Sequence, residues 1–201
     1  RFFREIGVKL LQFLPLVVRQ SGHGVGEHGV SAETVPAEAY GAFLSEVFDE
    51  WVRNDVGRIA LQNFDEASRQ YLGLKHSICI SREVCGDIVI VEHNGDFYCC
   101  DHFVTPEYRL GNIGETPLVE LLNSPEMHAF GERKRDTLPQ HCRDCEFLSS
   151  CNGGCPKDRF IRTPAGEEGL NYLCAGLKRF FAHTRPNLQR MAALMKSGRP
   201  P

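Results

Sequence analysis

The stretch "HCRDCEFLSSCNGGCPKDRF", residues 141–160, places four cysteines within fourteen positions. Their spacing is C-x2-C-x5-C-x3-C, with two glycines before the last cysteine and a proline after it. A structural zinc site often uses two CxxC pairs, but only the first pair here has that spacing. In bacterial two-cluster ferredoxins, the cysteine before a proline binds the other of the two clusters. The stretch therefore indicates either a zinc ion or iron–sulfur clusters.

The chain has nine cysteines, and all of them lie between residues 79 and 174. Eight thiols would hold two four-iron clusters, four thiols each, and would leave one cysteine over. Cys99 and Cys100 are neighbours on a predicted strand, so their side chains point to opposite faces. We assign Cys99 to packing, because a buried cysteine is a common small apolar residue. We expect Asn152, Gly153 and Gly154 to let the backbone curl and to offer amide N–H groups to cluster sulfides.

Composition limits the class of protein. The chain has 201 residues, of which 42% are hydrophobic, and a net charge of -3. These values predict a globular protein and favour neither a nucleic-acid partner nor an anionic membrane surface. The apolar segment 8–18 is too short to span a bilayer. A cysteine cluster without a recognisable secretory signal favours a cytoplasmic location.

Residues 1–74 alternate between strand and helix patterns. We predict that the strand within 8–18 is buried on both faces and that Gly73 ends the helix over 65–73. Gln62 and Asn63 are predicted to be hydrogen-bonded amides. The order strand, helix, strand, helix indicates parallel β/α units. Two such units cannot close a sheet, so we expect these residues to be the end of a larger β/α fold. Because the chain starts at Arg1, we also expect it to be part of a longer protein. The predicted elements are a strand within 8–18, a helix over 36–55, a strand over 57–64 and a short helix over 65–73.

Residues 75–201 have a different pattern, which predicts a small, loop-rich α+β domain. Asn94-Gly95 is a strong hairpin signal. Phe103 is expected in the core, and Asn112 in a turn. The predicted elements are a β-hairpin over 87–100, short helices within 116–135 broken near Pro125, a loop-rich stretch over 136–168, and a C-terminal helix over 171–196 that contains Pro186.

The spacing of the cysteines resembles a known family signature. The pattern C-x9-G-x4-C, then C-x2-C-x5-C-x3-C, then a final C resembles the SPASM domain, a C-terminal extension of certain radical SAM enzymes. It occurs here as Cys85, Gly95, Cys100, Cys142, Cys145, Cys151, Cys155 and Cys174. Cys79, "QFLPLVVR" (12–19), "GRIALQNFDEASRQYLG" (57–73) and "GDFYCCDHFVTPEYRLGNI" (95–113) resemble the anaerobic sulfatase-maturating enzymes of that superfamily.

The resemblance implies a fold and a set of site residues. Residues 1–74 would be the last β/α units of a partial TIM-type radical SAM barrel, and residues 75–201 a SPASM domain with two auxiliary [4Fe-4S] clusters. Asp101, directly after Cys100, would be the general base. The first cluster would be held by Cys79, Cys85, Cys100 and Cys155, and the second by Cys142, Cys145, Cys151 and Cys174.

The resemblance also implies a reaction. These enzymes oxidise a cysteine or serine of a sulfatase, within a C-x-P-x-R or S-x-P-x-R segment, to Cα-formylglycine. The full-length enzyme would also bind S-adenosyl-L-methionine on a further [4Fe-4S] cluster and receive electrons from a carrier such as flavodoxin or ferredoxin. Because the chain has no C-x3-C-x2-C motif for that cluster, we expect it to be inactive alone.

Two other functions fit parts of the pattern. One is another SPASM-type peptide-modifying radical SAM enzyme, and the other is a zinc-stabilised binding module without chemistry. Cys79 and the Cys100-Asp101 pair favour the sulfatase-maturating enzymes over the first alternative. Metal and sulfide analysis separates the second.

Overall fold

A computed structural model describes residues 2–20, 29–86 and 88–201. The chain divides into two compact units, one formed by residues 1–76 with 172–201 and the other by residues 77–171. Each unit is described by itself. The sequence predicts a glycine-rich loop after the first strand, and its histidines His23 and His28 lie outside the described residues, as does Asp87, the first residue of the predicted hairpin.

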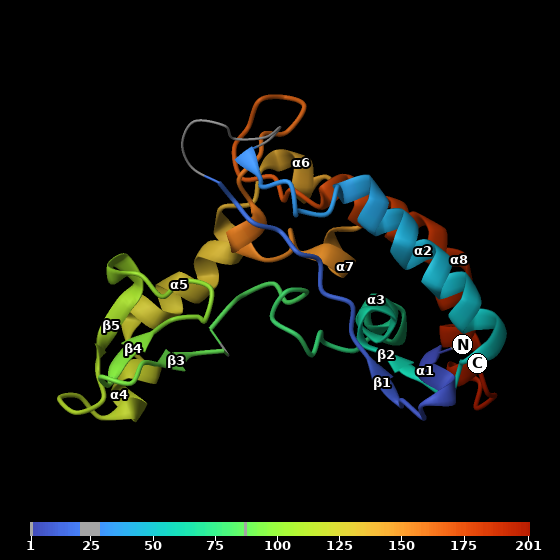
Figure 1. Cartoon of the computed structure of the whole chain (residues 1–201), viewed down its shortest axis with the longest axis horizontal. Helices are drawn as coiled ribbons and strands as arrows, with labels where there is room; N and C mark the ends of the chain where they lie inside the picture. Colours follow the sequence, from blue (N-terminus) through green and yellow to red (C-terminus); the bar gives the residue numbers. More distant parts are fainter. Residues whose placement is uncertain (1, 21–28, 87) are drawn as a thin grey trace. The chain divides into compact units, whose positions relative to one another are not determined.

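The first unit contains a parallel strand pair flanked by helices (Figure 1). Strand β1 (Leu10–Leu11) pairs in parallel with β2 (Ala60–Leu61). Helix α1 (Phe2–Glu5) precedes β1, α2 (Ala37–Asn54) connects the strands, and α3 (Gln62–Leu72) follows β2. Gly73 ends α3 in the left-handed conformation at φ 72°. The predicted order of parallel β/α units is therefore confirmed, while their assignment to a barrel stays a prediction.

The first strand differs from its prediction. Only Leu10 and Leu11 form a strand, and the apolar residues are not buried on both faces: Leu10 is 65% exposed and Leu14 is 74% exposed. A strand becomes buried on both faces only when other elements cover both of them, and β2 is its sole strand partner in the described residues. The second strand is likewise shorter than predicted, because α3 already begins at Gln62.

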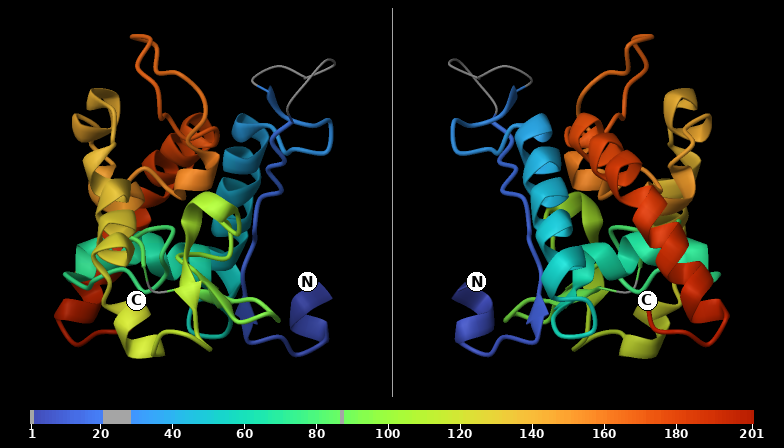
Figure 2. Two further views of the ribbon diagram at one scale, coloured as in Figure 1. Left: turned by 90° about the vertical axis from the view of Figure 1, so that its left-hand side faces the viewer. Right: turned by 90° about the vertical axis from the view of Figure 1, so that its right-hand side faces the viewer.

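Helix α8 (Cys174–Lys196) packs beside α2, as Figures 1 and 2 show. Aromatic side chains of α2, α3 and α8 form the core of this unit. Phe64 stacks on Phe180 with 5.8 Å between ring centroids, and Phe48 lies edge-on to Phe64 at 5.1 Å. The sequence grouped the C-terminal helix with the cysteine-rich region, residues 75–201. The structure instead places residues 172–201 in the same compact unit as residues 1–76.

Two glycines allow α2 and α8 to approach closely. A Cβ atom at Gly176 would meet the backbone oxygen of Ala37, and one at Gly41 would meet the backbone of Gly176. Because the obstacles are backbone atoms, they can give way only if a helix shifts. Gly176 lies two residues after Cys174, so this contact also fixes the start of α8, which carries a predicted cluster ligand.

We therefore expect Gly176→Ala to destabilise the protein by about 1–3 kcal/mol through overpacking. Helix propensity alone predicts the opposite sign, a gain of about 1 kcal/mol. Ala182→Gly, at an exposed position of the same helix, is the control and should cost about 1 kcal/mol. Urea unfolding followed by circular dichroism measures all three proteins. A Gly176→Ala protein more stable than the parent would contradict the packing argument.

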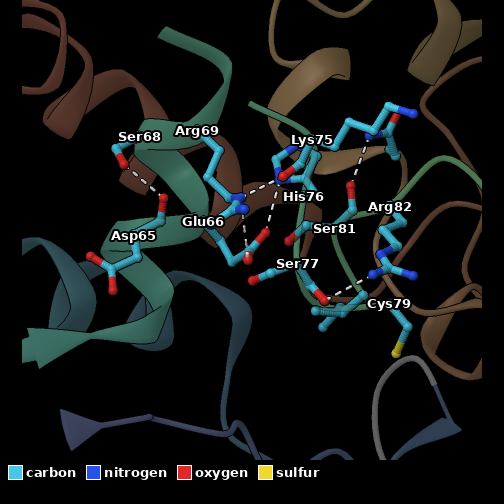
Figure 3. Close-up of polar contacts among 12 residues, drawn as sticks. Asp65, Glu66, Ser68, Arg69, Lys75, His76, Ser77, Cys79, Ser81 and Arg82 are labelled. Atoms are coloured by element: carbon cyan, nitrogen blue, oxygen red, sulfur yellow. Dashed lines mark hydrogen bonds and ion pairs between the residues drawn. The ribbon is translucent and has the colours of Figure 1, made fainter. Parts of the chain in front are cut away.

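The segment that leaves α3 is tied down by polar contacts (Figure 3). Glu66 is 4% exposed, and its Oε2 lies 2.9 Å from His76 Nδ1. Arg69 Nε donates to the Lys75 carbonyl at 2.5 Å.

At the start of α3, the Asn63 side chain accepts from Phe13 N and donates to Phe13 O, so its prediction as a hydrogen-bonded amide is confirmed.

The second unit is built on a three-stranded antiparallel sheet. Strand β4 (Asp96–Tyr98) lies between β3 (Ile90–Val91) and β5 (Arg109–Asn112). The β3–β4 hairpin was predicted, and Gly95 adopts φ 88° in its turn. Strand β5 was not predicted. The Asn112 side chain donates to Asn94 O at 2.9 Å and fastens the end of β5 to the hairpin turn.

Short helices complete this unit. Ser124 accepts a hydrogen bond from Met127 N and Pro125 occupies the first turn of α5, so the predicted helix break at Pro125 is confirmed. No helix among the described residues is long and apolar enough to cross a membrane. The helices and short 3-10 turns of the unit are α4 (Leu118–Leu122), α5 (Pro125–Asp136), α6 (Gln140–Arg143), α7 (Leu148–Cys151), η2 (Pro106–Tyr108) and η3 (Pro156–Asp158).

Candidate functional site

Seven of the eight predicted cluster ligands lie in the second unit, and Cys174 begins α8 in the first. None of the nine cysteines, all of which the structure describes, forms a disulfide. A thiolate at Cys174 would sit at the positive end of the α8 dipole, a favourable place for a negative sulfur.

The sulfurs of the first predicted set act on one another. Burial raises the pKa of Cys85, and Cys79 raises it further, although Lys134 and Arg159 oppose the shift. Burial also raises the pKa of Cys155 to about 11, with a smaller contribution from Cys85. Cys79, Cys85 and Cys155 therefore interact electrostatically although they lie far apart in the sequence, and the backbones of the first two both contact α5, at Lys134 and Gly131.

Cys100 joins the same set. Burial raises the pKa of its thiol to about 12, the His102 N–H opposes this, and Asp101 and Cys155 add to it. A buried thiol of this kind ionises only when a cation or metal offsets the charge. The raised pKa values of Cys85, Cys100 and Cys155 therefore disfavour free thiolate chemistry at these three positions.

Backbone N–H groups point at three of the predicted ligands. Cys100 Sγ accepts from His102 N at 3.5 Å, and Cys145 Sγ accepts from Phe147 N at 3.5 Å. Cys155 accepts from Lys157 N. In each case the donor lies two residues after the cysteine. Hydrogen bonds to sulfur tune iron–sulfur clusters, so the donor set fits such a group.

The backbone of the CNGGC loop curls as predicted, but two of its three amides donate to carbonyl groups rather than being available to cluster sulfides. Asn152, Gly153 and Gly154 have φ values of 45°, 71° and 63°. Asn152 N donates to Leu148 O and Gly154 N to Cys151 O, so these two amides are already used. A Cβ at Gly153 would collide with the Arg159 guanidinium, which explains the need for glycine there.

Asp101 lies directly after Cys100, in a turn beyond β4. Cys100 Sγ donates to Asp101 Oδ1 at 3.2 Å. The Asp101 side chain is 46% exposed, and His102 Nδ1 lies 4.0 Å from the same oxygen. A carboxylate that touches a predicted ligand and faces solvent is able to take a proton from a bound peptide.

Cys99 lies in a small apolar core, so its predicted packing role is confirmed. It is 2% exposed and packs with Met127 and Phe130. Phe103 lies 5.6 Å from Phe130 between ring centroids, so its predicted core position is also confirmed.

The positions of the cysteine sulfurs do not favour the zinc alternative. A zinc ion with bonds of about 2.3 Å gathers its sulfurs to within about 4 Å of one another. Among the residues that the structure describes, no three Cys, His, Asp or Glu side chains form a group able to hold one metal ion. In a [4Fe-4S] cluster each thiolate binds a different iron, so its four ligands stand farther apart.

Two cations beside the thiols were not singled out from the sequence. Lys134 is 1% exposed, and Arg159 is half-buried. For Lys134 a signal existed: it is the last member of a helical stripe, 127, 130, 131 and 134, whose other members are apolar or glycine. No pattern marked Arg159, because its role depends on contacts made by folding.

Comparisons with known proteins identify a matching domain family and similar enzymes. The SPASM family, described as an iron-sulfur cluster-binding domain, matches residues 79–146. The chain is 44% identical to a serine-type anaerobic sulfatase-maturating enzyme of Bacteroides thetaiotaomicron, over 94% of the chain and 48% of the relative. It is 30% identical to a cysteine-type anaerobic sulfatase-maturating enzyme of Clostridium perfringens, over 98% of the chain and 52% of the relative.

A solved structure shows the same fold. "Native anSMEcpe with bound AdoMet and Cp18Cys peptide" superposes with a TM-score of 0.81 at 28% identity, over 96% of this chain and 53% of that one. The chain thus spans about half the length of the relatives that it matches.

Proposed function

We propose, because the chain belongs to the family of anaerobic sulfatase-maturating enzymes, that it supplies two auxiliary [4Fe-4S] clusters and the general base for oxidation of a sulfatase cysteine or serine to Cα-formylglycine. The observation that supports the proposal most is the electrostatic interaction among the thiols of Cys79, Cys85, Cys100 and Cys155, together with the contact of Cys100 with Asp101. The first cluster would use these four thiols. The second would use Cys142, Cys145, Cys151 and Cys174.

The proposed reaction divides the two hydrogens that the substrate loses. In the intact enzyme, a radical derived from S-adenosyl-L-methionine removes one hydrogen atom from the substrate Cβ. The remaining hydrogen leaves as a proton and an electron, and a C=S or C=O bond forms. The clusters that the eight cysteines would hold would supply the acceptor for that electron.

Asp101 would take the proton. Its carboxylate is exposed enough to reach a peptide, and its contact with Cys100 keeps the base next to a cluster ligand. The groups that receive the proton and the electron would then lie next to each other. A positioned general base of this kind contributes about 10²–10⁴-fold to a rate.

The partners follow from the same proposal. The substrate is a sulfatase segment with the sequence C-x-P-x-R or S-x-P-x-R, and a flavodoxin or ferredoxin supplies electrons to the intact enzyme. Cysteines that hold iron–sulfur clusters suit a reducing compartment, so we place the protein in the cytoplasm.

Mass spectrometry of a substrate peptide tests the proposal. The intact enzyme, reconstituted without oxygen, should convert the serine peptide with a loss of two hydrogens, and the cysteine peptide to the same aldehyde after hydrolysis of the thioaldehyde. A peptide with the target residue replaced by alanine is the control. Formation of a thioether crosslink in place of the aldehyde would contradict the proposal.

A further inference from the structure

One face of α5 is buried, and a lysine ends its buried stripe. Met127, Phe130, Gly131 and Lys134 recur at helical spacing, and Lys134 is 1% exposed. A buried ammonium is unfavourable unless hydrogen-bond acceptors satisfy it.

Backbone carbonyl groups satisfy Lys134. Its Nζ donates to Cys79 O at 2.6 Å, to Ile80 O at 3.0 Å and to Arg82 O. Asn152 Nδ2 donates to the remaining carbonyl of this turn, Ser81 O, at 2.8 Å. Lys134 therefore fixes the turn that carries Cys79, a predicted ligand of the first cluster.

The same helix also fixes Cys85. Cys85 N donates to Gly131 O at 3.1 Å, and a Cβ at Gly131 would collide with Cys85 O. Gly131 lies one turn before Lys134 on the buried face of α5. One helical face thus places the backbones of two predicted ligands and brings a positive charge to them.

Arg159 plays the corresponding part at the CNGGC loop. Its Nε donates to Gly153 O at 2.9 Å, and its Nη2 donates to Asn152 O at 2.7 Å and to Gly154 O at 3.3 Å. Its Nη1 donates to Lys134 O at 2.6 Å, which ties the two cations to one framework.

The two cations contact backbone that belongs to different predicted sets. The Lys134 ammonium contacts the turn that carries Cys79, a ligand of the first set. The Arg159 guanidinium contacts the three residues that join Cys151 of the second set to Cys155 of the first, and it interacts electrostatically with thiols of both sets. Loss of Lys134 and loss of Arg159 should therefore have distinguishable effects.

We propose that Lys134 and Arg159 are positioning residues whose fixed positive charges set the reduction potentials of the two clusters, Lys134 for the first cluster and Arg159 for both. The inference rests on the proposed function, since it presupposes both clusters. A [4Fe-4S] cluster with four thiolate ligands is an anion and becomes more negative when it gains an electron. A nearby cation in a low-dielectric site favours the reduced form, so its removal lowers the potential.

Potentiometric titration followed by electron paramagnetic resonance measures the effect on the chain reconstituted anaerobically with ferrous iron and sulfide. At the parent's midpoint potential, Lys134→Met should reduce the ratio of reduced to oxidised first cluster about tenfold or more, or about 59 mV for a one-electron couple. The second couple should stay in place. Arg159→Gln should lower both couples.

Matched variants remove the same charge without the same contacts. Arg135 follows Lys134 in the sequence but is on the exposed side of α5, so Arg135→Met is the control for Lys134→Met. Arg162 follows Arg159 by three residues and has a 65% exposed side chain, so Arg162→Gln is the control for Arg159→Gln. Neither should move a potential. Lys134→Arg, which keeps the charge, should restore the first couple toward the parent value.

Each outcome decides the inference. Unchanged potentials in Lys134→Met, with about eight irons retained, would overturn it. If Lys134→Met loses the first cluster while Lys134→Arg keeps it, the result supports the role of the charge. If both variants lose the first cluster equally, Lys134 acts only through packing and the inference is overturned. If the parent chain itself binds no cluster, the proposed function fails instead.

Discussion

Replacement of Asp101 by asparagine should lower the rate of peptide oxidation in the intact enzyme by about 10²–10⁴-fold. Asparagine keeps the shape of the side chain but cannot accept the proton. The Asp101 carboxylate is exposed and contacts Cys100, so its loss should leave the fold intact. Peptide product and 5'-deoxyadenosine are measured together by mass spectrometry.

The two products distinguish a base from a structural residue. If Asp101 acts after the hydrogen atom has been removed, Asp101→Asn should still cleave S-adenosyl-L-methionine while aldehyde formation falls. Glu115→Gln, an exposed carboxylate change in the same unit, should oxidise peptide at the parent rate. An Asp101→Asn enzyme within about threefold of the parent would refute the assignment of Asp101 as the base.

The adjacent cysteines give the second large effect. Cys100→Ala should lower the bound iron of the chain from about eight to about four, because it removes one ligand of the first cluster. Cys99→Ala should retain about eight irons and lose roughly 1 kcal/mol of stability, since Cys99 is only a small buried apolar group. Iron and acid-labile sulfide analysis, with thermal unfolding, measures both variants.

This pair of variants is matched within one dipeptide. Iron loss in Cys99→Ala together with retention in Cys100→Ala would reverse the assignment of the two thiols. Full retention in both would remove Cys100 from the ligand set. The structure favours the stated assignment because Cys99 packs on Met127 while Cys100 accepts the His102 N–H.

Local patterns explain what the sequence predicted well. The hairpin depends on Asn94-Gly95, the end of α3 on Gly73, and the start of α5 on Ser124-Pro125, and each of these signals acts within a few residues. The cysteine spacing was also visible in the sequence, but the division of the thiols into two sets came from the family resemblance and stays a prediction.

Features that depend on tertiary contacts were missed. The grouping of α8 with the first unit depends on the close approach of Gly41 and Gly176, which neither helix reveals alone. Leu10 and Leu14 looked like strand-core residues, yet burial requires a covering element on each face. Lys134 and Arg159 act through carbonyl groups of other loops, and no sequence pattern encodes those partners.

The metal content of the chain tests the central claim most directly. After anaerobic reconstitution with iron and sulfide, we expect about eight irons and about eight acid-labile sulfides per chain, which corresponds to two [4Fe-4S] clusters. Roughly one or two zinc ions per chain, with no sulfide, would contradict the account and leave a zinc-stabilised module in its place.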